Sequence, residues 1–220
     1  MRLSLYSHWR SSSTWRVRIG LGLKGLHYEY RAVDLRAGEQ DRPEHRSRSP
    51  FGFVPALEVE EGGATLVLAQ SMAILEYLDE RFPEPPLLPL DPAGRARVRA
   101  LAEHVNSAIQ PLQNSAVLRF LGERKEGLDR DFARHFNEVR LFALEAALSD
   151  GGAGRFCHGD VPGLADCYLV PQLYAARRFA VDLTPFPSLR RIEEACAALP
   201  AFRAAHAHRQ PDTPADQREP

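Results

Sequence analysis

The chain of 220 residues is long enough for one large domain or two modest ones, and its 44% hydrophobic and 26% charged residues are ordinary for a globular protein. Its 28 Lys and Arg against 29 Asp and Glu give a net charge of −1, which excludes a strongly basic protein of the nucleic-acid-binding or membrane-surface class. No stretch approaches the roughly 20 apolar residues of a membrane span and the N-terminus lacks a signal peptide's apolar run, so we expect a cytoplasmic protein without nucleic-acid or membrane partners.

Residues 1–82 predict a small α/β domain. A strand–helix–strand order implies a right-handed parallel unit, and a following hairpin around Gly62-Gly63 makes the sheet mixed. Serine caps in front and Lys24-Gly25 behind are start and stop signals for the first helix. In chain order the predicted elements are strand 2–6, a helix after the hydroxyl cluster 11–14, strand 28–33, hairpin strands 54–59 and 65–68, and helix 71–81.

The rest of the chain predicts an all-helical domain. Residues 83–92 contain five prolines and predict an extended linker, and Asp91-Pro92 is a good N-cap and first helical position. Residues 93–220 form the helical domain, and its tail from about residue 206 is polar and proline-containing, so we expect it to be loosely ordered. Apolar and charged residues alternate at helical spacing near 92–121, 129–149, 164–179 and 188–198.

The first candidate site is the cluster Ser11-Ser12-Ser13-Thr14 between the first strand and the first helix. The carboxyl end of a strand leading into a helix is a favoured ligand site, and the helix N-terminus favours an anion. A hydroxyl there can donate a hydrogen bond to a thiolate and lower the pKa of a bound thiol. Helix capping alone also explains the cluster, because Ser and Thr are common caps.

Two further pairs in the first domain are candidates for ligand binding. Val54-Pro55, directly before a strand, suits an edge position or a cis bond that presents the preceding backbone to a ligand. Gln70-Ser71 leads into a helix, where amide groups and the Ser71 hydroxyl can hold a carboxylate. An ordinary edge proline and an ordinary N-cap are the plainer interpretations.

In the helical domain, Gln110 and Asn114 lie four residues apart, so we expect them on one helix face with a kink at Pro111 between them. Such a pair suits the wall of a cleft, although a solvent-facing pair fits equally well. Arg177-Arg178 could supply a cation for an acidic substrate, and a solvated helix face is the alternative.

Several other chemistries lack a motif. The three cysteines, Cys157, Cys167 and Cys196, are widely spaced without a CxxC pair, which argues against a disulfide framework and a zinc site. The eight histidines show no HExxH pattern, and there is no GxGxxG or P-loop sequence. We therefore expect no metal, no nucleotide and a reducing compartment.

Taken together, the motifs resemble the zeta class of the glutathione transferases, the maleylacetoacetate isomerase family. They span nearly the whole chain in the family's order, which makes the resemblance more specific than any single motif. They are Ser11–Ile19, Val54-Pro55, Gln70-Ser71, Ile109–Asn114, Ala165-Asp166, Leu169–Gln172, Arg178-Phe179, Val181–Pro185 and the tail Arg209–Pro214.

The resemblance implies a fold, an assembly and a set of roles. It implies a thioredoxin-like, glutathione-binding α/β domain over residues 1–82, an all-α substrate domain after the linker, and a homodimer. Ser11 would hydrogen-bond the glutathione sulfur, with Ser12, Arg10 and Arg178 as the other catalytic residues and the two arginines facing the carboxylates of a small dicarboxylate substrate. The glutathione-binding residues would be Ser11, Ser12, Ser13, Gln40, Val54, Gln70, Ser71, Gln110, Asn114 and Ser115.

The implied reaction is the cis–trans isomerisation of maleylacetoacetate to fumarylacetoacetate in aromatic amino-acid breakdown. It needs a thiolate that adds reversibly to a conjugated double bond, and groups that hold the dicarboxylate. Alternatives are a maleylpyruvate isomerase, a transferase or dehalogenase acting on small α-halo acids, and a non-catalytic scaffold of the same fold. The joint presence of Ser11, Gln70, Ser71 and Gln110 argues against the scaffold.

The sequence departs from the family pattern at two places. Many members have Cys where this chain has Ser13, so the sulfur must come from glutathione and reductase-type side activities become doubtful. The usual Thr-x-x-Asp capping box is Gly163-x-x-Asp166, which keeps the carboxylate and loses the hydroxyl. We expect a stability cost of roughly 0.5 kcal/mol or less, because Gly is a tolerable cap.

Overall fold

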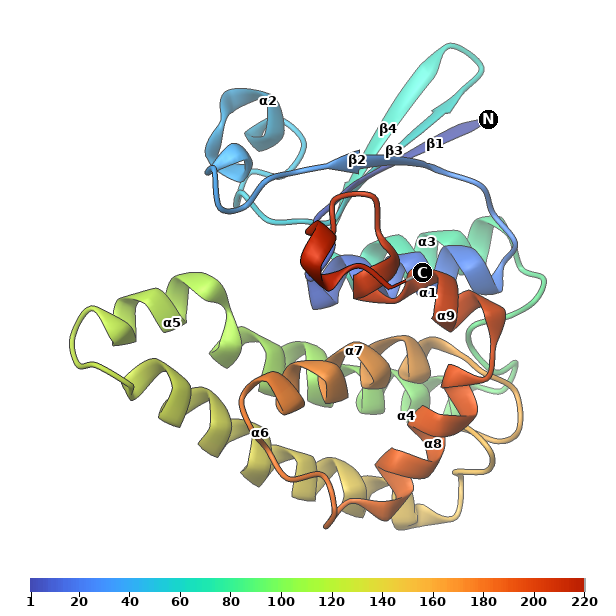
Figure 1. The fold of residues 1–220 in the computed structure, drawn as a ribbon. Helices are drawn as coiled ribbons and strands as arrows, with labels where there is room; N and C mark the ends of the chain where they lie inside the picture. The colour runs from blue at the N-terminus through green and yellow to red at the C-terminus, as the bar shows by residue number, and fades with distance from the viewer. Residues whose placement is uncertain (220) are drawn as a thin grey trace. The chain divides into compact units, whose positions relative to one another are not determined.

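The computed structural model describes residues 1–219, and the chain folds into two compact units. Unit 1 contains Met1–Pro86 together with Leu199–Pro220, and unit 2 contains Leu87–Ala198. Figure 1 shows the elements of each unit.

Unit 1 is built on a four-stranded sheet with the order β2-β1-β3-β4. The β1 and β2 strands are parallel, whereas β3 is antiparallel to both β1 and β4. This is the mixed sheet that the strand–helix–strand order and the hairpin predict. The elements are β1 (Arg2–Ser7), α1 (Ser12–Leu23), β2 (Glu29–Ala32), α2 (Pro43–Arg46), β3 (Ala56–Glu61), β4 (Ala64–Ala69), α3 (Ser71–Arg81) and α9 (Pro200–Ala205).

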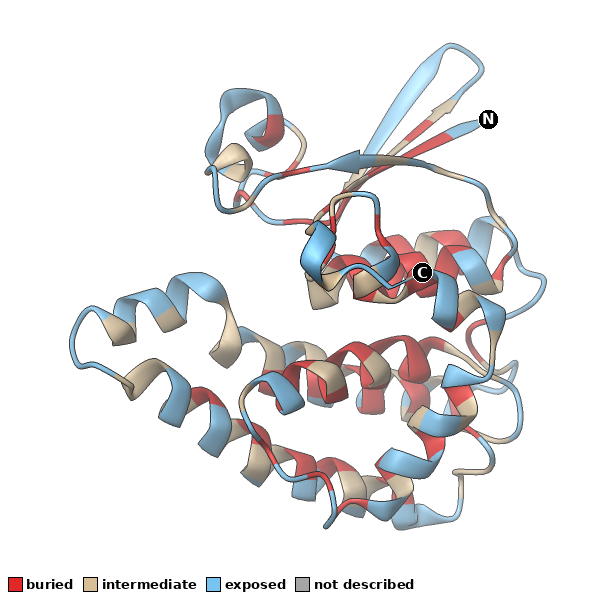
Figure 2. Cartoon of the chain, viewed as in Figure 1, coloured by how far each residue is buried: buried red, intermediate tan, exposed pale blue. Residues whose placement is uncertain are grey.

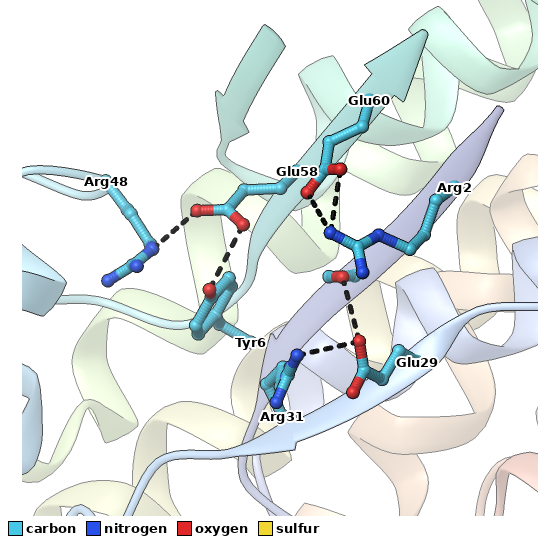
Figure 3. A network of polar contacts seen from close by, with 8 residues as sticks. Arg2, Tyr6, Glu29, Arg31, Arg48, Glu58 and Glu60 are labelled. Carbon is cyan, nitrogen blue, oxygen red and sulfur yellow. Dashed lines mark hydrogen bonds and ion pairs between the residues drawn. The ribbon is translucent and has the colours of Figure 1, made fainter. Parts of the chain in front are cut away.

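The two faces of this sheet differ in chemistry. Leu3 and Leu5 of β1 and Leu57 and Val59 of β3 are buried, and α1 and α3 lie on one side of the sheet (Figures 1 and 2). The alternate residues carry polar groups that bond across the strands (Figure 3). The bonds across strands join Arg2 to Glu60, Tyr6 to Glu58 and Ser4 to Glu29, and Arg31 pairs with Glu29 of its own strand β2. The period of two along each strand therefore separates an apolar core from a charged face.

Residues 199–220 pack with the α/β unit, whereas the sequence places them in the helical domain. The physical reason is the close contact of α9 with α1. A Cβ added at Gly22 would lie 3.1 Å from the Cβ of Ala201, so glycine permits this approach. The carbonyl of Ala205 also accepts a hydrogen bond from Arg18 Nε of α1 at 3.1 Å.

The expectation of a loosely ordered tail is wrong. Gln210 and Thr213 are only 4% and 3% exposed. Thr213 Oγ1 donates to the carbonyl of Ala207 at 2.7 Å, and Gln210 Nε2 donates to the carbonyls of Ala204 and His206. Polar composition predicts exposure here, but these side chains satisfy backbone carbonyls and so fold the tail onto itself.

Unit 2 is helical, as the apolar periodicity predicts. Among residues 1–219 no helix is long and apolar enough to cross a membrane. Asp166 accepts from the amide of Gly163 at 2.8 Å, which is the half of the capping box that the sequence predicts. The elements are α4 (Pro92–Glu103), a π-helical turn (His104–Ile109), a 3-10 turn (Gln110–Gln113), α5 (Ser115–Gly122), α6 (Leu128–Ala147), a 3-10 turn (Leu148–Asp150), α7 (Leu164–Arg178) and α8 (Pro187–Ala197).

The shared helix face expected for Gln110 and Asn114 is wrong. The chain leaves α-helical geometry at His104, and Asn114 has an extended backbone with φ −62° and ψ 139°. Pro111 has no amide hydrogen to continue the helix, which accounts for a break rather than a kink. Asn114 instead caps α5, its side-chain oxygen accepting from the amide of Ala116 at 2.9 Å.

A buried ion pair fixes the end of α3 in unit 1. Lys24 Nζ donates to Asp79 at 2.8 Å and to the carbonyls of Phe82 and Pro85 at 2.6 and 2.9 Å.

We expect Lys24→Met to lower the free energy of unfolding by about 3–5 kcal/mol, because Asp79 loses its buried cation. Denaturant unfolding measures the effect. Arg2→Met, which removes an exposed ion pair with Glu60, is the control and should lower the free energy of unfolding far less, because water screens exposed pairs. Equal losses for the two variants would contradict the assignment.

Candidate active site

The strand register of unit 1 brings three candidate segments to one end of the sheet. Tyr6 of β1 is paired with Ala56 of β3, and Ala56 is paired with Ala69 of β4. The loop after β1, the Val54-Pro55 segment before β3 and the Gln70-Ser71 step after β4 therefore all leave the sheet at this end. The sequence names these segments separately, and the register is what joins them.

Ser11 lies at the N-cap of α1. Its backbone is extended, its amide donates to the carbonyl of His8 at 3.0 Å, and its Oγ accepts from the amide of Thr14 at 3.4 Å. The capping interpretation of this residue is therefore correct. Capping uses the oxygen as an acceptor, and a hydroxyl also carries one hydrogen that it can donate. Capping and thiol activation are thus compatible at Ser11.

The hydroxyls of the cluster are not equivalent. Ser11, Ser12 and Ser13 are partly exposed, whereas Thr14 is fully buried. Thr14 Oγ1 donates to the carbonyls of His8 and Ser11, at 3.1 and 3.0 Å. Thr14 therefore shapes the loop, and only the three serines present hydroxyls toward solvent or a ligand.

A buried arginine holds the same loop from inside. Arg18 of α1 is 1% exposed. Its guanidinium donates to the carbonyl of Trp9 at 2.9 Å, to Ser7 Oγ at 3.2 Å and to Thr14 Oγ1 at 3.2 Å. Burial lowers the pKa of Arg18, but a guanidinium stays charged in proteins. The loop before Ser11 is therefore wrapped around a permanent positive charge.

Gln40 and Gly52 belong to the segment between β2 and β3. Gln40 Nε2 donates to Asp41 at 3.1 Å, while its buried Oε1 has no hydrogen-bond partner among the described residues. Gly52 has φ +66°, and a Cβ there would lie 3.0 Å from the carbonyl oxygen of Gln40. The tight turn therefore requires glycine at Gly52. The unbonded Oε1 of Gln40 can accept a hydrogen bond from a ligand.

Val54 offers backbone groups. The Val54–Pro55 bond is cis, one of the two forms that the sequence predicts. Val54 is 8% exposed, yet its backbone forms no hydrogen bond within residues 1–219. Buried backbone groups are nearly always paired in proteins, so an extended ligand backbone fits here as an added strand.

The segment before Val54 is anchored on both sides. His45 Nε2 lies 2.9 Å from the carbonyl oxygen of Phe53 and Ser49 Oγ accepts from the amide of Phe53 at 3.2 Å. Arg48 donates to Glu58 at 2.6 Å, and Glu58 also accepts from Tyr6 (Figure 3). These contacts fix the backbone on which Val54 lies.

Gln70 and Ser71 form the third segment. Gln70 has φ 74° and ψ 121°, a region that non-glycine residues rarely adopt and that persists at sites where the surroundings hold it. Ser71 is buried and is the first residue of α3, and its Oγ accepts from Arg16 Nη1 at 3.2 Å. The amino end of α3 suits a carboxylate.

Arg10 lies in the same loop as Ser11. It is partly exposed, its Cζ lies 5.1 Å from the centre of the Trp9 ring, and its amide donates to His8 Nδ1 at 3.3 Å. Within residues 1–219 it forms no ion pair. The Arg10 guanidinium is therefore available to bind an anionic ligand.

The remaining candidates belong to unit 2. Gln110 begins the 3-10 turn, Asn114 caps α5, and Ser115 is exposed as the first residue of that helix. Arg178 is the last residue of α7, and its Cζ lies 5.6 Å from the centre of the Phe179 ring. The neighbouring Arg177 forms an ion pair with Glu193. The role of these unit 2 residues in ligand binding stays a prediction.

Sequence reasoning missed Arg18, His45 and the tail residue Asp212. Asp212 accepts from the amide of Trp9 at 2.9 Å and from Tyr30 at 2.6 Å. The signal that could have revealed the buried cation is the pair of arginines, Arg16 and Arg18, within an otherwise apolar stretch of the first helix. Asp212 lies in the tail motif Arg209–Pro214, but the motif does not reveal its contacts, because its partners lie about 200 and 180 residues away.

The described residues include no group of three or more His, Cys, Asp or Glu that could hold a metal ion. Burial raises the pKa of Cys157 and Cys196, and all three cysteines are buried and outside any disulfide. All three cysteines belong to unit 2, so unit 1 offers no thiol of its own.

The profile of the family "Glutathione S-transferase, N-terminal domain" matches residues 1–80. A curated relative, maleylacetoacetate isomerase of Pseudomonas aeruginosa, is 48% identical over 97% of this chain and 100% of its own length. A crystal structure of maleylacetoacetate isomerase from Anaeromyxobacter dehalogenans 2CP-1, with bound dicarboxyethyl glutathione and citrate in the active site, is 66% identical with a TM-score of 0.90, covering 97% of this chain and 98% of that one.

A holo structure of maleyl pyruvate isomerase, described as a bacterial glutathione S-transferase in the zeta class, is 44% identical with a TM-score of 0.90 and covers 96% of this chain and 100% of that one. The mixed sheet with its helices and the helical unit make this chain a protein of the glutathione transferase fold, which confirms the predicted fold class. The chain belongs to the zeta-class glutathione transferase and maleylacetoacetate isomerase family, as the motifs predict.

The histidine of the Ser11 loop predicts a pH effect. Burial lowers the pKa of His8, and the charge of Asp212 opposes this only in part. Because the folded pKa lies below the ordinary value of 6.5, the stabilisation is complete above about pH 6.5 and is lost as the pH falls through the folded pKa. His8→Asn keeps an acceptor for the Arg10 amide without a titrating group, so we expect it to lose less stability than the wild type between pH 7.5 and 5.5.

Thermal unfolding across this pH range measures the difference. His27→Asn, at an exposed position, is the matched control and should follow the wild type. A His8→Asn variant that loses as much stability on acidification as the wild type would show that the imidazole is not held neutral by the fold.

Proposed function

We propose that this protein is a glutathione-dependent isomerase that converts maleylacetoacetate to fumarylacetoacetate. The observation that carries the proposal is the meeting of three segments at one end of the sheet: the Ser11 loop, the unbonded backbone of Val54, and the Gln70-Ser71 step. These groups suit a thiol-bearing tripeptide with an extended backbone and carboxylate ends. Family membership and the names of the relatives agree with this function.

Bound glutathione would supply the thiolate that adds reversibly to the conjugated double bond of the substrate. Ser11 donates its hydroxyl hydrogen toward the sulfur and so stabilises the thiolate. The Ser12 and Ser13 segment lies at the amino end of α1, where backbone amides and the helix dipole favour negative charge.

The tripeptide itself is held by the other segments. Val54 pairs its backbone N–H and C=O with the peptide groups of the ligand, as an added strand does. Gln40 offers its unbonded Oε1 to a ligand amide. Gln70 and Ser71 hold the carboxylate of the γ-glutamyl end at the amino terminus of α3. Gln110, Asn114 and Ser115 are proposed to contribute from the helical unit.

The substrate is a dicarboxylate, and Arg10 and Arg178 are the proposed cations for its two ends. Arg10 is partly exposed and lies next to Ser11 in sequence. Arg178, at the end of α7, is the better match to the family. A guanidinium can bind a carboxylate through two parallel hydrogen bonds, which orients the substrate as well as attracting it.

Maleylpyruvate is the second candidate substrate. The zeta-class relative named maleyl pyruvate isomerase is 44% identical over nearly the whole chain, close to the level of the maleylacetoacetate isomerase of Pseudomonas aeruginosa. Both substrates present the same cis double bond and differ in the length of the acyl chain. Comparison of kcat/KM for the two compounds decides between them.

We further propose that the enzyme works as a homodimer in the cytoplasm, in the breakdown of tyrosine and phenylalanine. Its three cysteines are buried and form no disulfide, which suits a reducing compartment. The resemblance to the family supports the dimer and the pathway.

The reaction is tested with maleylacetone, a stable analogue of the substrate, with and without glutathione. We expect isomerisation that depends on glutathione, because the chain itself offers no exposed thiol among its cysteines. No rate, or a rate indifferent to glutathione, would overturn the proposed function.

The assigned role of Ser11 gives a second prediction. Ser11→Ala should reduce kcat about 10²–10³-fold, the usual cost of removing one donor that stabilises a developing or bound anion. Ser13→Ala, in the same turn of the helix, is the matched control and should change kcat only a few-fold. If Ser13→Ala proves as damaging as Ser11→Ala, the activating hydroxyl is misassigned.

A further inference from the structure

We propose that Asp212, in the C-terminal tail, is a positioning residue for this reaction: it fixes the backbone of Trp9 and thereby sets the position of the Ser11 hydroxyl. The inference rests on the proposed function, because Ser11 acts there on the glutathione sulfur. It assigns a catalytic purpose to a tail that lies about 200 residues from the active-site loop in sequence.

The contacts of Asp212 are the first step. Its Oδ2 accepts from the backbone N–H of Trp9 at 2.9 Å, and its Oδ1 accepts from Tyr30 Oη at 2.6 Å. Burial raises the pKa of Tyr30, so its hydroxyl remains a donor at neutral pH. One carboxylate therefore joins the loop after β1 to strand β2.

The second step is the way in which the tail presents this carboxylate. Gln210 and Thr213, on either side of Asp212, are buried and bond to carbonyls of the preceding turn. Arg218 Nη2 donates to the carbonyls of Pro211 and Thr213 at 2.7 and 3.0 Å. The side chains around Asp212 thus fold the tail into a rigid turn, while Asp212 itself reaches out of it.

The third step concerns Arg18, which bonds to the other backbone group of Trp9. Asp212 holds the N–H of Trp9, and Arg18 Nη2 holds the C=O of the same residue at 2.9 Å. Both peptide groups of Trp9 are therefore fixed by charged side chains. Trp9 is 3% exposed, and its ring makes an edge contact with His208 of the tail at 5.8 Å between ring centres.

The fourth step leads from Trp9 to Ser11. The amide of Ser11 donates to the carbonyl of His8, which also accepts from Thr14 Oγ1. Only Arg10 separates the clamped residue from Ser11, so a shift of the Trp9 peptide moves the serine with it. Misplacement of a catalytic group by about 1 Å can cost as much as 10²-fold in rate.

A purely structural tail would need no carboxylate at this point. Its own turn is held by Gln210, Thr213 and Arg218, and α9 packs on α1 through Ala201 and Gly22. The bonds of Asp212 all go to the β1–α1 loop and to Tyr30. Because the turn of the tail is held without Asp212, the contacts of Asp212 point to a role in positioning the loop.

The test uses Asp212→Ala and the matched control Asp216→Ala, which removes an exposed carboxylate from the same tail. In the ligand-free protein, hydrogen exchange of the Trp9 amide should rise in Asp212→Ala and stay at the wild-type rate in Asp216→Ala. This readout needs neither glutathione nor turnover, so it decides the contact even if the wild type has no isomerase activity, an outcome that would overturn the proposed function instead.

A double-mutant cycle with Ser11→Ala tests the catalytic purpose. Asp212→Ala should lower kcat about 10- to 100-fold in the wild-type background, with a smaller change in KM for glutathione, because other segments hold the tripeptide. In the Ser11→Ala background the same substitution should cost less than about twofold. Equal losses of kcat in both backgrounds, or unchanged exchange of the Trp9 amide, would overturn the proposal.

Asp212→Asn is the variant to test if Asp212→Ala fails to fold. Its amide oxygen can still accept from Trp9 N–H, and its NH₂ group can donate to Tyr30 Oη. We expect this variant to keep kcat within a few-fold of the wild type and to protect the Trp9 amide. An Asn variant that folds but loses that protection and 100-fold in kcat would contradict the assigned contact.

Discussion

The α/β unit depends on one buried charge, the guanidinium of Arg18. It is 1% exposed and is surrounded by carbonyl and hydroxyl oxygens instead of a bonded carboxylate: those of Ser7, His8, Trp9, Thr14 and Ala205. Burying a charge is costly unless it is hydrogen-bonded, so these oxygens must gather around it. The same requirement bends the chain after β1, folds α9 against α1 and places Ser11 at the N-cap.

The proposed function rests on the polar groups that form no hydrogen bond in this arrangement. The backbone of Val54 and the Oε1 of Gln40 form no hydrogen bond within the described chain, although their surroundings are buried. Gln70 holds a rarely populated backbone conformation directly before α3. Buried polar groups in folded proteins are usually hydrogen-bonded, so these unbonded groups indicate a place for a ligand with amide and carboxylate groups. Ser11 caps its helix through its side-chain oxygen, and in the proposed function it also donates its hydroxyl hydrogen to that ligand.

Much of the fold could be predicted from the sequence, because local signals were strong where structure is local. Helix 71–81 and the hairpin around Gly62-Gly63 have the predicted bounds within two residues. The tail and the Gln110–Asn114 segment could not be predicted correctly, since composition does not show that Gln210 will bond to backbone carbonyls, or that the helix already changes at His104. Motifs named Ser11 as a candidate site residue, and its role stays a prediction. The tail motif included Asp212 without assigning it a role, because that role depends on contacts between distant parts of the chain.

The central claim is that the Ser11 loop stabilises the thiolate of bound glutathione, and the pKa of that thiol measures it directly. The ultraviolet absorbance of the thiolate, followed against pH in the complex of the wild-type protein with glutathione, gives the value. We expect a pKa clearly below the ordinary value of about 8.5 for a free thiol. A bound thiol that titrates at the same pH as free glutathione would contradict the claim.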